Sequence, residues 1–242
     1  MRTLIIPDIH NRTAEAEALL ARIPHDRVVF LGDYFDSFGD NPEDAQRTAE
    51  WLRNSLDHPE RIHLFGNHDL PYAVPDTPDV FCPGWSPAKH EVVSEILNVS
   101  HWDQLRLVHV MGSLLCCHAG VSRHVFEHPM LGLTPEGVSR YCEQALRQAR
   151  GGMGHPAVAW SPMPDDGCSG ITWLRWWEMP VLEEFNQVVG HTPGELRVRR
   201  EGDRFNVCLD THGEWIGLVE EDILSAINTA TGRQKRIGAV YS

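Results

Sequence analysis

Residues 27–36, RVVFLGDYFD, join an unbroken apolar run to a glycine and two aspartates. Such a run, stopped by a glycine, predicts a short strand that is buried on both faces. TLIIPD (residues 3–8) and RIHLFGN (residues 61–67) repeat the pattern on either side, each ending beside a polar side chain. These three stretches therefore predict parallel strands in a sheet that is covered by helices.

Two helices are predicted between these strands. The first spans residues 13–23, with Thr13 as the expected N-cap. Its expected buried face consists of Ala14, Ala18, Leu19 and Ile23. The second spans residues 42–56, where Pro42 suits the first helical turn. The opening of the chain is thus predicted as β-α-β-α-β.

The second half of the chain has a different pattern. Residues 105–110 and 113–119 predict two strands joined by a turn, and residues 196–210 predict a hairpin that turns at Gly202-Asp203. EWIGLV (residues 214–219) and RIGAVY (residues 236–241) add further strand patterns. Residues 123–185 contain a helical stretch, a Gly/Pro-rich loop and the aromatic run WLRWW. We expect one domain, residues 1–242, with 123–185 as an insertion over the substrate side.

The composition limits the classes of function. The chain has 242 residues, a formal net charge of -13 and a pI near 5.5. This balance argues against long nucleic acids and anionic membrane surfaces as partners, although a bound cation would still admit a small anionic substrate. No apolar stretch approaches the roughly 20 residues that cross a bilayer. The six cysteines include no Cys-x-x-Cys pair, so we expect reduced thiols and a cytoplasmic location.

Polar side chains follow five of the apolar runs directly. They are Asp8 and His10, Asp33 and Asp36, Asn67 to Asp69, His118, and His191. Parallel strands gather their carboxyl ends at one edge of a sheet, so these oxygen and nitrogen donors are expected to converge. The donor set suits Mn, Fe, Zn or Co, and there are enough donors for two ions if one carboxylate bridges them. The absence of a cysteine cage argues against a structural zinc site, and the histidines argue against a dedicated calcium site.

Five sequence blocks together resemble those of the calcineurin-like metallophosphoesterases. The blocks are DIH (8–10), GDYFD (32–36), GNHD (66–69), HAG (118–120) and GHT (190–192). The resemblance implies an α/β fold, a two-sheet β-sandwich flanked by helices in four layers, α/β/β/α. VCLDTHGEWIGL (207–218) also resembles the strand-turn-strand of the protein phosphatase and diadenosine tetraphosphatase branches.

Carried over by position, the resemblance implies two divalent cations, with Mn²⁺ expected first and Fe, Zn or Co as alternatives. The implied ligands are Asp8 and His10 for one ion, Asp33 as the bridge, and Asn67, His118 and His191 for the other. A hydroxide that bridges the cations would attack phosphorus. His68 would then protonate the leaving group, and Asp36 would orient His68. The implied activity is hydrolysis of a phosphomonoester, a nucleotide or a dinucleoside polyphosphate.

The sequence also departs from the family pattern. Ser37-Phe38 stand where the protein phosphatase branch has a phosphate-binding arginine, and Pro193 replaces a second histidine found in many phosphodiesterases. Arg12, Arg123 and Arg175 are candidate replacements for the arginine, and His212 is a further candidate for the metal edge. Two alternatives remain: a catalytically silent metal-binding scaffold or regulatory protein, and a Ser/Thr protein phosphatase. The substrate and the oligomeric state are not determined by the sequence.

Overall fold

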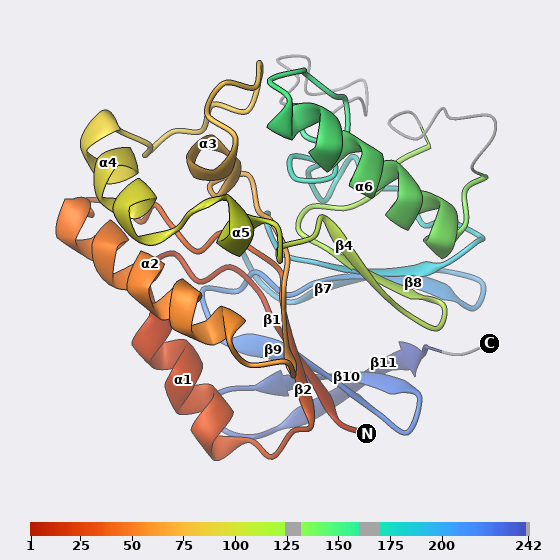
Figure 1. Cartoon of the computed structure of the whole chain (residues 1–242). Helices are drawn as coiled ribbons and strands as arrows, with labels where there is room; N and C mark the ends of the chain where they lie inside the picture. Colours follow the sequence, from red (N-terminus) through yellow and green to blue (C-terminus); the bar gives the residue numbers. More distant parts are fainter. Residues whose placement is uncertain (124–131, 160–169, 241–242) are drawn as a thin grey trace.

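The computed structural model describes residues 1–123, 132–159 and 170–240, whose strands form two facing sheets (Figure 1). The first sheet has the strand order β11-β10-β9-β1-β2-β3. Its strands are β1 (Thr3–Ile6), β2 (Arg27–Phe30), β3 (Arg61–His63), β9 (Trp215–Glu220), β10 (Ile223–Asn228) and β11 (Gln234–Ala239). β1, β2 and β3 are parallel, as the apolar runs predict, and β9 pairs with β1 in the antiparallel sense.

The second sheet has the order β4-β5-β6-β8-β7. Its strands are β4 (Val108–Met111), β5 (Leu114–Cys117), β6 (Asn186–Val189), β7 (Arg197–Glu201) and β8 (Arg204–Cys208). β5, β6 and β8 are parallel to one another, whereas β4 and β7 are antiparallel edge strands. The predicted hairpin at Gly202-Asp203 is confirmed between β7 and β8.

Helices cover the outer face of each sheet (Figure 1). They are α1 (Thr13–Arg22), α2 (Pro42–Leu56), α3 (Leu70–Ala73), α4 (Pro87–Ile96), α5 (Val99–Trp102) and α6 (Pro135–Arg150). α1 and α2 lie over the first sheet, α4 packs on α2, and α6 packs against β4. The expected four-layer α/β/β/α arrangement is therefore confirmed.

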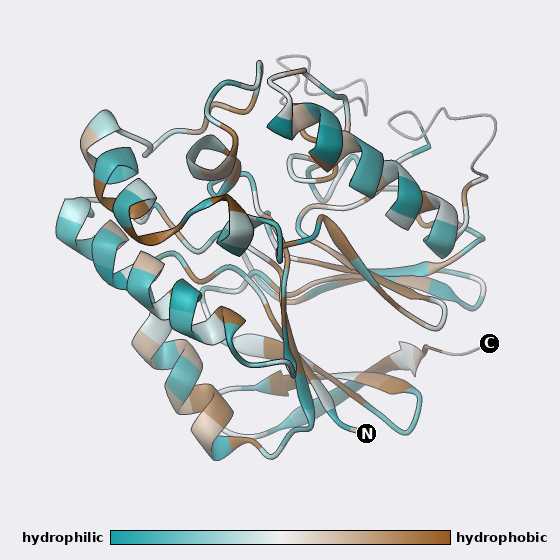
Figure 2. Ribbon diagram, viewed as in Figure 1, coloured by the Kyte–Doolittle hydropathy of each residue, from teal (hydrophilic) through white to brown (hydrophobic). Residues whose placement is uncertain are grey.

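The strands at the centre are apolar on both faces because each face has its own core. In β1, Leu4 and Ile6 pack toward the helices, whereas Ile5 packs between the sheets. β2 divides in the same way, with Phe30 on the helical side and Val29 on the inter-sheet side. The brown colour that continues along these strands in Figure 2 reflects this double burial. Two-sided burial explains why the runs lack the alternation of half-exposed strands.

The predicted face of α1 is correct only in part, because Leu19 and Ile23 are half-buried and pack against the core. The helix buries Ala16 and Leu20, while Ala14 and Ala18 are exposed. Its N-cap is Arg12, not Thr13. Apolar residues recur along two overlapping stripes of this helix. Packing against the sheet selects the stripe that contains Leu20, because burial of a leucine removes more apolar surface from water than burial of an alanine.

Several elements were not predicted, namely β10, α3, α4 and α5. The interpretation of residues 123–185 as a substrate-side insertion stays a prediction, because 124–131 and 160–169 lie outside the described residues. Within the described part of the chain, none of the helices has the length and apolar character needed to cross a bilayer.

Gly238 in β11 tests the packing between the two sheets. A Cβ at this position would meet Cε1 of Phe205 at 2.5 Å, and the Phe205 side chain is completely buried in the opposite sheet. We expect Gly238→Ala to lower the free energy of unfolding by about 1–3 kcal/mol, because the ring has no space into which to move. Urea unfolding measures the effect. Gly154→Ala is the control, since its Cβ would lie 3.8 Å from Pro78 and the expected change is within about 0.5 kcal/mol. Equal stabilities of the two variants would contradict the packing.

Candidate metal centre

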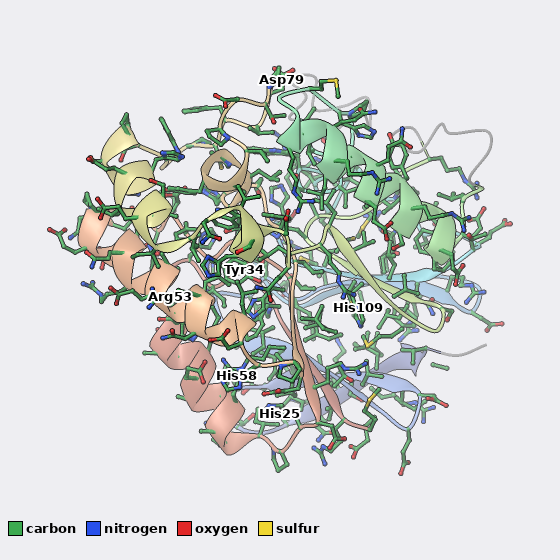
Figure 3. All side chains as sticks on the ribbon, in the orientation of Figure 1. His25, Tyr34, Arg53, His58, Asp79 and His109 are labelled. Atoms are coloured by element: carbon green, nitrogen blue, oxygen red, sulfur yellow. The ribbon has the colours of Figure 1, made fainter. Side chains whose placement is uncertain are left out.

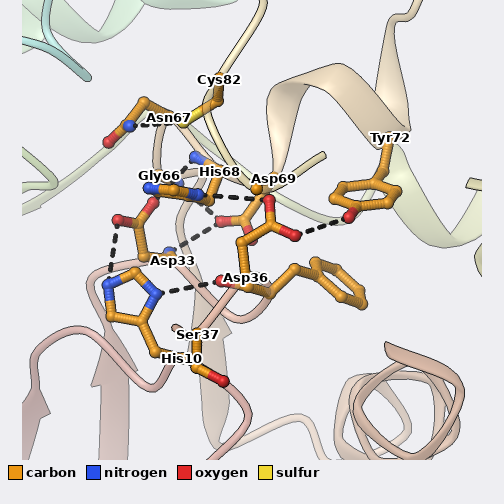
Figure 4. Close-up of polar contacts among 12 residues, drawn as sticks. His10, Asp33, Asp36, Ser37, Gly66, Asn67, His68, Asp69, Tyr72 and Cys82 are labelled. Atoms are coloured by element: carbon orange, nitrogen blue, oxygen red, sulfur yellow. Dashed lines mark hydrogen bonds and ion pairs between the residues drawn. The ribbon is translucent and has the colours of Figure 1, made fainter. Parts of the chain in front are cut away.

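The predicted donors converge at one edge of the molecule, where strands of both sheets end. Asp8 and His10 follow β1, Asp33 and Asp36 follow β2, and Asn67 follows β3. His118 follows β5 and His191 follows β6, which are parallel neighbours in the second sheet. The first sheet thus supplies mainly carboxylates, and the second sheet supplies imidazoles. Figure 4 shows the part of this edge around Asp33, His68 and Asp36.

Two groups of donors share the Asp33 carboxylate. One group contains Asp8, His10 and Asp33, and the other contains Asp33, His118 and His191. Within each group, one ligand atom of every residue lies within 4.8 Å of the others. The amide oxygen of Asn67 lies 2.9 Å from Nε2 of His118, beside the second group. The arrangement therefore offers two adjacent sets of N and O ligands with a carboxylate common to both.

The imidazoles of His10 and His118 are held in a ligand-ready orientation. Nδ1 of His10 donates to the carbonyl oxygen of Phe35 at 3.0 Å, and Nδ1 of His118 donates to that of Leu31 at 3.0 Å. A carbonyl can only accept, so Nδ1 carries the proton in both rings. Nε2 is then directed at Asp33, at 3.6 Å from His10 and 3.3 Å from His118. A backbone partner on the far nitrogen is typical of metal-binding histidines.

Nε2 of His118 faces two oxygens, Oδ2 of Asp33 and Oδ1 of Asn67, and both are acceptors. The contact between Nε2 and these oxygens is favourable only if Nε2 carries a proton or a cation lies between the atoms. Burial lowers the pKa of His118, but the charge of Asp33 outweighs burial and raises the pKa to about 9. Burial lowers the pKa of the neighbouring His191 to about 3, with His118 acting in the same direction. The donor chemistry fits a divalent cation in place of the proton.

The backbone is strained at several of these positions. His10, Asp33, Asp36 and His191 all have positive φ angles, of 43°, 53°, 62° and 65°. Residues other than glycine seldom adopt this left-handed region. Backbone strain of this kind concentrates at functional sites. The close approach of the loops needs Gly66 as well, because a Cβ there would meet Oδ1 of Asp33 at 2.1 Å.

Asp69 holds the loops after β2 and β3 together. Its side chain is fully buried and accepts three backbone N–H groups at 2.8 Å, those of Asp33, Tyr34 and Gly66. Burial and the charge of Asp33 raise the pKa of Asp69 to about 7. Both of its oxygens accept in either protonation state. The resemblance assigned no role to this last residue of the GNHD block.

His68 lies beside the candidate metal ligands, and its ring is held by Asp36. Nδ1 of His68 donates to Oδ2 of Asp36 at 3.2 Å, and the hydroxyl of Tyr72 donates to Oδ1 of the same carboxylate at 2.8 Å (Figure 4). Burial lowers the pKa of His68, but the charge of Asp33 and the bond to Asp36 raise it to about 11. The imidazole can therefore hold a proton at the edge of the site.

The three candidate arginines lie in different settings. Arg12 donates to the carbonyl oxygens of Asp8, Ile9 and His212, so it connects the loop after β1 to the loop before β9. Arg123 pairs with Glu184 at 2.9 Å. Arg175 is 40% exposed, pairs with Glu178 and stacks over Trp177. A substrate role for any of them stays a prediction.

Sequence analysis assigned no role to four residues at or near this edge, namely Tyr72, Cys82, Lys89 and Asp210, whereas it had noted Trp173 as part of the aromatic run WLRWW. Cys82 accepts from the amide of Asn67 at 3.1 Å, and the ring of Trp173 meets that of His191 edge-on with centroids 5.9 Å apart. Burial and the charge of Asp8 raise the pKa of Asp210 to about 7. Their sequence contexts resemble ordinary loop and helix, so only the three-dimensional structure reveals these contacts.

The comparisons with known proteins agree with this geometry. The family model of the calcineurin-like phosphoesterases matches residues 1–206. The chain belongs to the calcineurin-like phosphoesterase family. This membership covers the five blocks and both groups of donors.

Among solved structures, the chain is similar to Yfce, a phosphoesterase from E. coli, with 13% identity and a TM-score of 0.50 over 99% of this chain and 100% of that one. A metallophosphoesterase from Sphaerobacter thermophilus is 17% identical, with a TM-score of 0.47 over 100% of this chain and 90% of that one. The first similarity shows a shared fold. None of the curated proteins compared with the chain matches it.

Asp69 offers a test of the loop geometry. Asp69→Asn replaces one of its acceptor oxygens by an amide, so at least one of three buried N–H groups loses its partner. We expect the free energy of unfolding in urea to fall by about 1–3 kcal/mol. Asp203→Asn, in the exposed turn between β7 and β8, should change it by less than about 0.5 kcal/mol. An Asp69→Asn protein as stable as the control would contradict the assigned network.

Proton release tests the ligand role of His118. With a pKa raised to about 9, His118 is protonated in the metal-free protein at neutral pH and must lose that proton to bind a cation. Its protonation stabilises the metal-free fold fully below the usual value of 6.5, and this contribution is lost as the pH rises through about 9. Titration calorimetry with Mn²⁺ in buffers of different ionisation enthalpy should show proton release at pH 7 that declines toward pH 9. Binding heats that do not depend on the buffer would exclude this linkage.

Proposed function

We propose that the chain is a hydrolase of phosphoesters that depends on two divalent metal ions. The observation that carries the proposal is the pair of donor groups that share Asp33, with a proton-bearing histidine beside them. We assign Asp8, His10 and Asp33 to one ion and Asp33, Asn67, His118 and His191 to the other. Mn²⁺ is the proposed ion, and Fe, Zn or Co fit the same donors.

The residues of the chain would divide the reaction between them. Two cations on these ligands would acidify a shared water and offset the charge on the phosphoryl oxygens. His68 would give its proton to the departing oxygen, a contribution of about 10²–10⁴-fold for a positioned general acid. Asp36 would keep the ring in place, because its Oδ2 accepts from Nδ1 and leaves Nε2 directed away from the carboxylate.

We propose a phosphomonoester, a nucleotide or a dinucleoside polyphosphate as the substrate. Trp173 supports a flat ring near the second ion, because its indole lies edge-on to His191. Trp177, 61% exposed, adds a second indole in the same segment. Arg175 and Arg123 remain the proposed phosphate contacts, since each lies on the surface and its ion pair can exchange. A cytoplasmic location remains a prediction.

The scaffold alternative predicts bound metal without turnover. Asp33, Asn67 and His68 are all in place with their supporting contacts, which favours a working hydrolase. The sequence has no arginine directly after Asp36, where the protein phosphatase branch has one that binds phosphate. A Ser/Thr protein phosphatase would therefore need another phosphate-binding group.

The direct test is hydrolysis of p-nitrophenyl phosphate and bis-p-nitrophenyl phosphate by protein stripped with a chelator and then given Mn²⁺. We expect turnover that needs the metal and is faster on the monoester. His68→Asn should keep its metals and lose about 10²–10⁴-fold in kcat on a substrate with a poor leaving group.

His58→Asn is the matched control. His58 lies on the connection after α2, 52% exposed and paired with Glu60 (Figure 3), so its activity should equal that of the unchanged protein. Bound metal with no turnover of either ester would favour the scaffold alternative. Equal losses in the two histidine variants would contradict the proposed role of His68.

A further inference from the structure

Lys89 of α4 is a buried cation next to the His68–Asp36 pair. Its side chain is 6% exposed, although it comes from the first turn of a surface helix. The ammonium donates to Oδ1 of Asp36 at 3.1 Å, to Oδ1 of Asp40, and to the carbonyl oxygen of Gly84 at 2.8 Å. An ammonium has three donors, and here each has an acceptor. Lys89 is thus fixed in one position.

A buried lysine such as Lys89 is unusual for this chain. The sequence has only two lysines, Lys89 and Lys235, among its 21 lysines and arginines. Lys235 is exposed on β11. A charge that leaves water is unfavourable unless its partners compensate, and two carboxylates do so for Lys89. Burial lowers its pKa, but the hydrogen bonds to Asp40 and Asp36 outweigh burial and raise the pKa above the usual value.

The partners of Asp36 are divided between its two oxygens. Oδ1 accepts from Lys89 and from the hydroxyl of Tyr72, and Oδ2 accepts from Nδ1 of His68. The carboxylate itself is 1% exposed, so water does not supply these contacts. Gly84 also closes over it, because a Cβ there would lie 2.9 Å from Cβ of Asp36. With Oδ1 held by two donors, the carboxylate has one orientation, and Oδ2 is left for His68.

We propose that Lys89 is a positioning residue for the proton transfer by His68, which it reaches through Asp36. The inference rests on the proposed hydrolase function. The acceptors of the Lys89 ammonium are Asp36, Asp40 and Gly84, and none of these is an expected metal ligand. Lys89 fixes the carboxylate that in turn fixes the ring, and the segment from residue 70 to 96 is thereby part of the catalytic arrangement.

A purely structural role of Lys89 predicts a different effect of its replacement on activity. A lysine that only anchors α4 to the loop after β2 would, when removed, lower the activity on every ester alike. A positioning role is selective, because proton transfer matters for a poor leaving group and adds little for one that departs readily as an anion. The leaving-group dependence of kcat therefore separates the two roles.

The experiment measures kcat of the Mn²⁺-loaded full chain on phenyl phosphate, p-nitrophenyl phosphate and 2,4-dinitrophenyl phosphate. Lys89→Met should lose about 10–100-fold on phenyl phosphate, the usual range for a supporting contact, and little on the dinitrophenyl ester. Lys89→Met added to His68→Asn should cause no further loss, because the group that it positions is already absent. Lys235→Met is the control and should match the unchanged protein on all three esters.

Two further variants protect the test against loss of folding. Lys89→Met combined with Asp40→Asn removes one charge of each sign, and it should show the same selective loss. Asp40→Asn alone keeps the contact from Lys89 to Asp36, so its ratio of rates across the esters should be that of the unchanged protein. Equal losses on all three esters, or a full additional loss in the His68→Asn background, would overturn the proposal. Absence of metal-dependent turnover in the unchanged protein would instead contradict the proposed function.

Discussion

The Asp33 carboxylate is a buried negative charge at the point where the two sheets meet, and the surrounding structure compensates it. It follows β2 of the first sheet and faces His118 of the second, while His10 approaches from β1. The backbone at Asp33 is left-handed, and glycine at position 66 makes room for its oxygen. Two cations that share this carboxylate would satisfy its charge better than a single proton, and the donors around it suit such ions.

Three buried aspartates at this edge differ in what surrounds them. Asp33 faces imidazoles and is suited to metal, whereas Asp69 accepts backbone N–H groups and holds loops together. Asp36 faces Lys89, Tyr72 and His68, and it is suited to orienting a proton donor. The environment of each carboxylate, rather than its residue type, determines its role. One residue type thus stands in three different settings at the same edge of the molecule.

Several arginines of this acidic chain donate to its own backbone. Arg12 bonds three carbonyl oxygens around the metal edge, and Arg199 donates to the carbonyl oxygen of Met179 at 2.6 Å. In this way Arg12 joins the loop after β1 to the loop before β9. The segment of residues 173–177 carries Arg175 and three tryptophans, and the ring of its Trp173 meets that of His191 edge-on.

The sequence by itself determined the parallel strands and the donors at their ends. An apolar run such as VVFL must be buried on both faces, and Asp33 and His118 follow such runs directly, so the sheet edge brings them together. Only the tertiary structure decided the face of α1, the supporting place of Arg12 and the contacts of Lys89 and Asp69. The local sequence indicates which chemistry a residue can perform. It does not indicate which residue, distant in the chain, the side chain contacts. Lys89 and Asp36 are 53 positions apart, and only the packing of α4 on α2 brings the ammonium to the carboxylate.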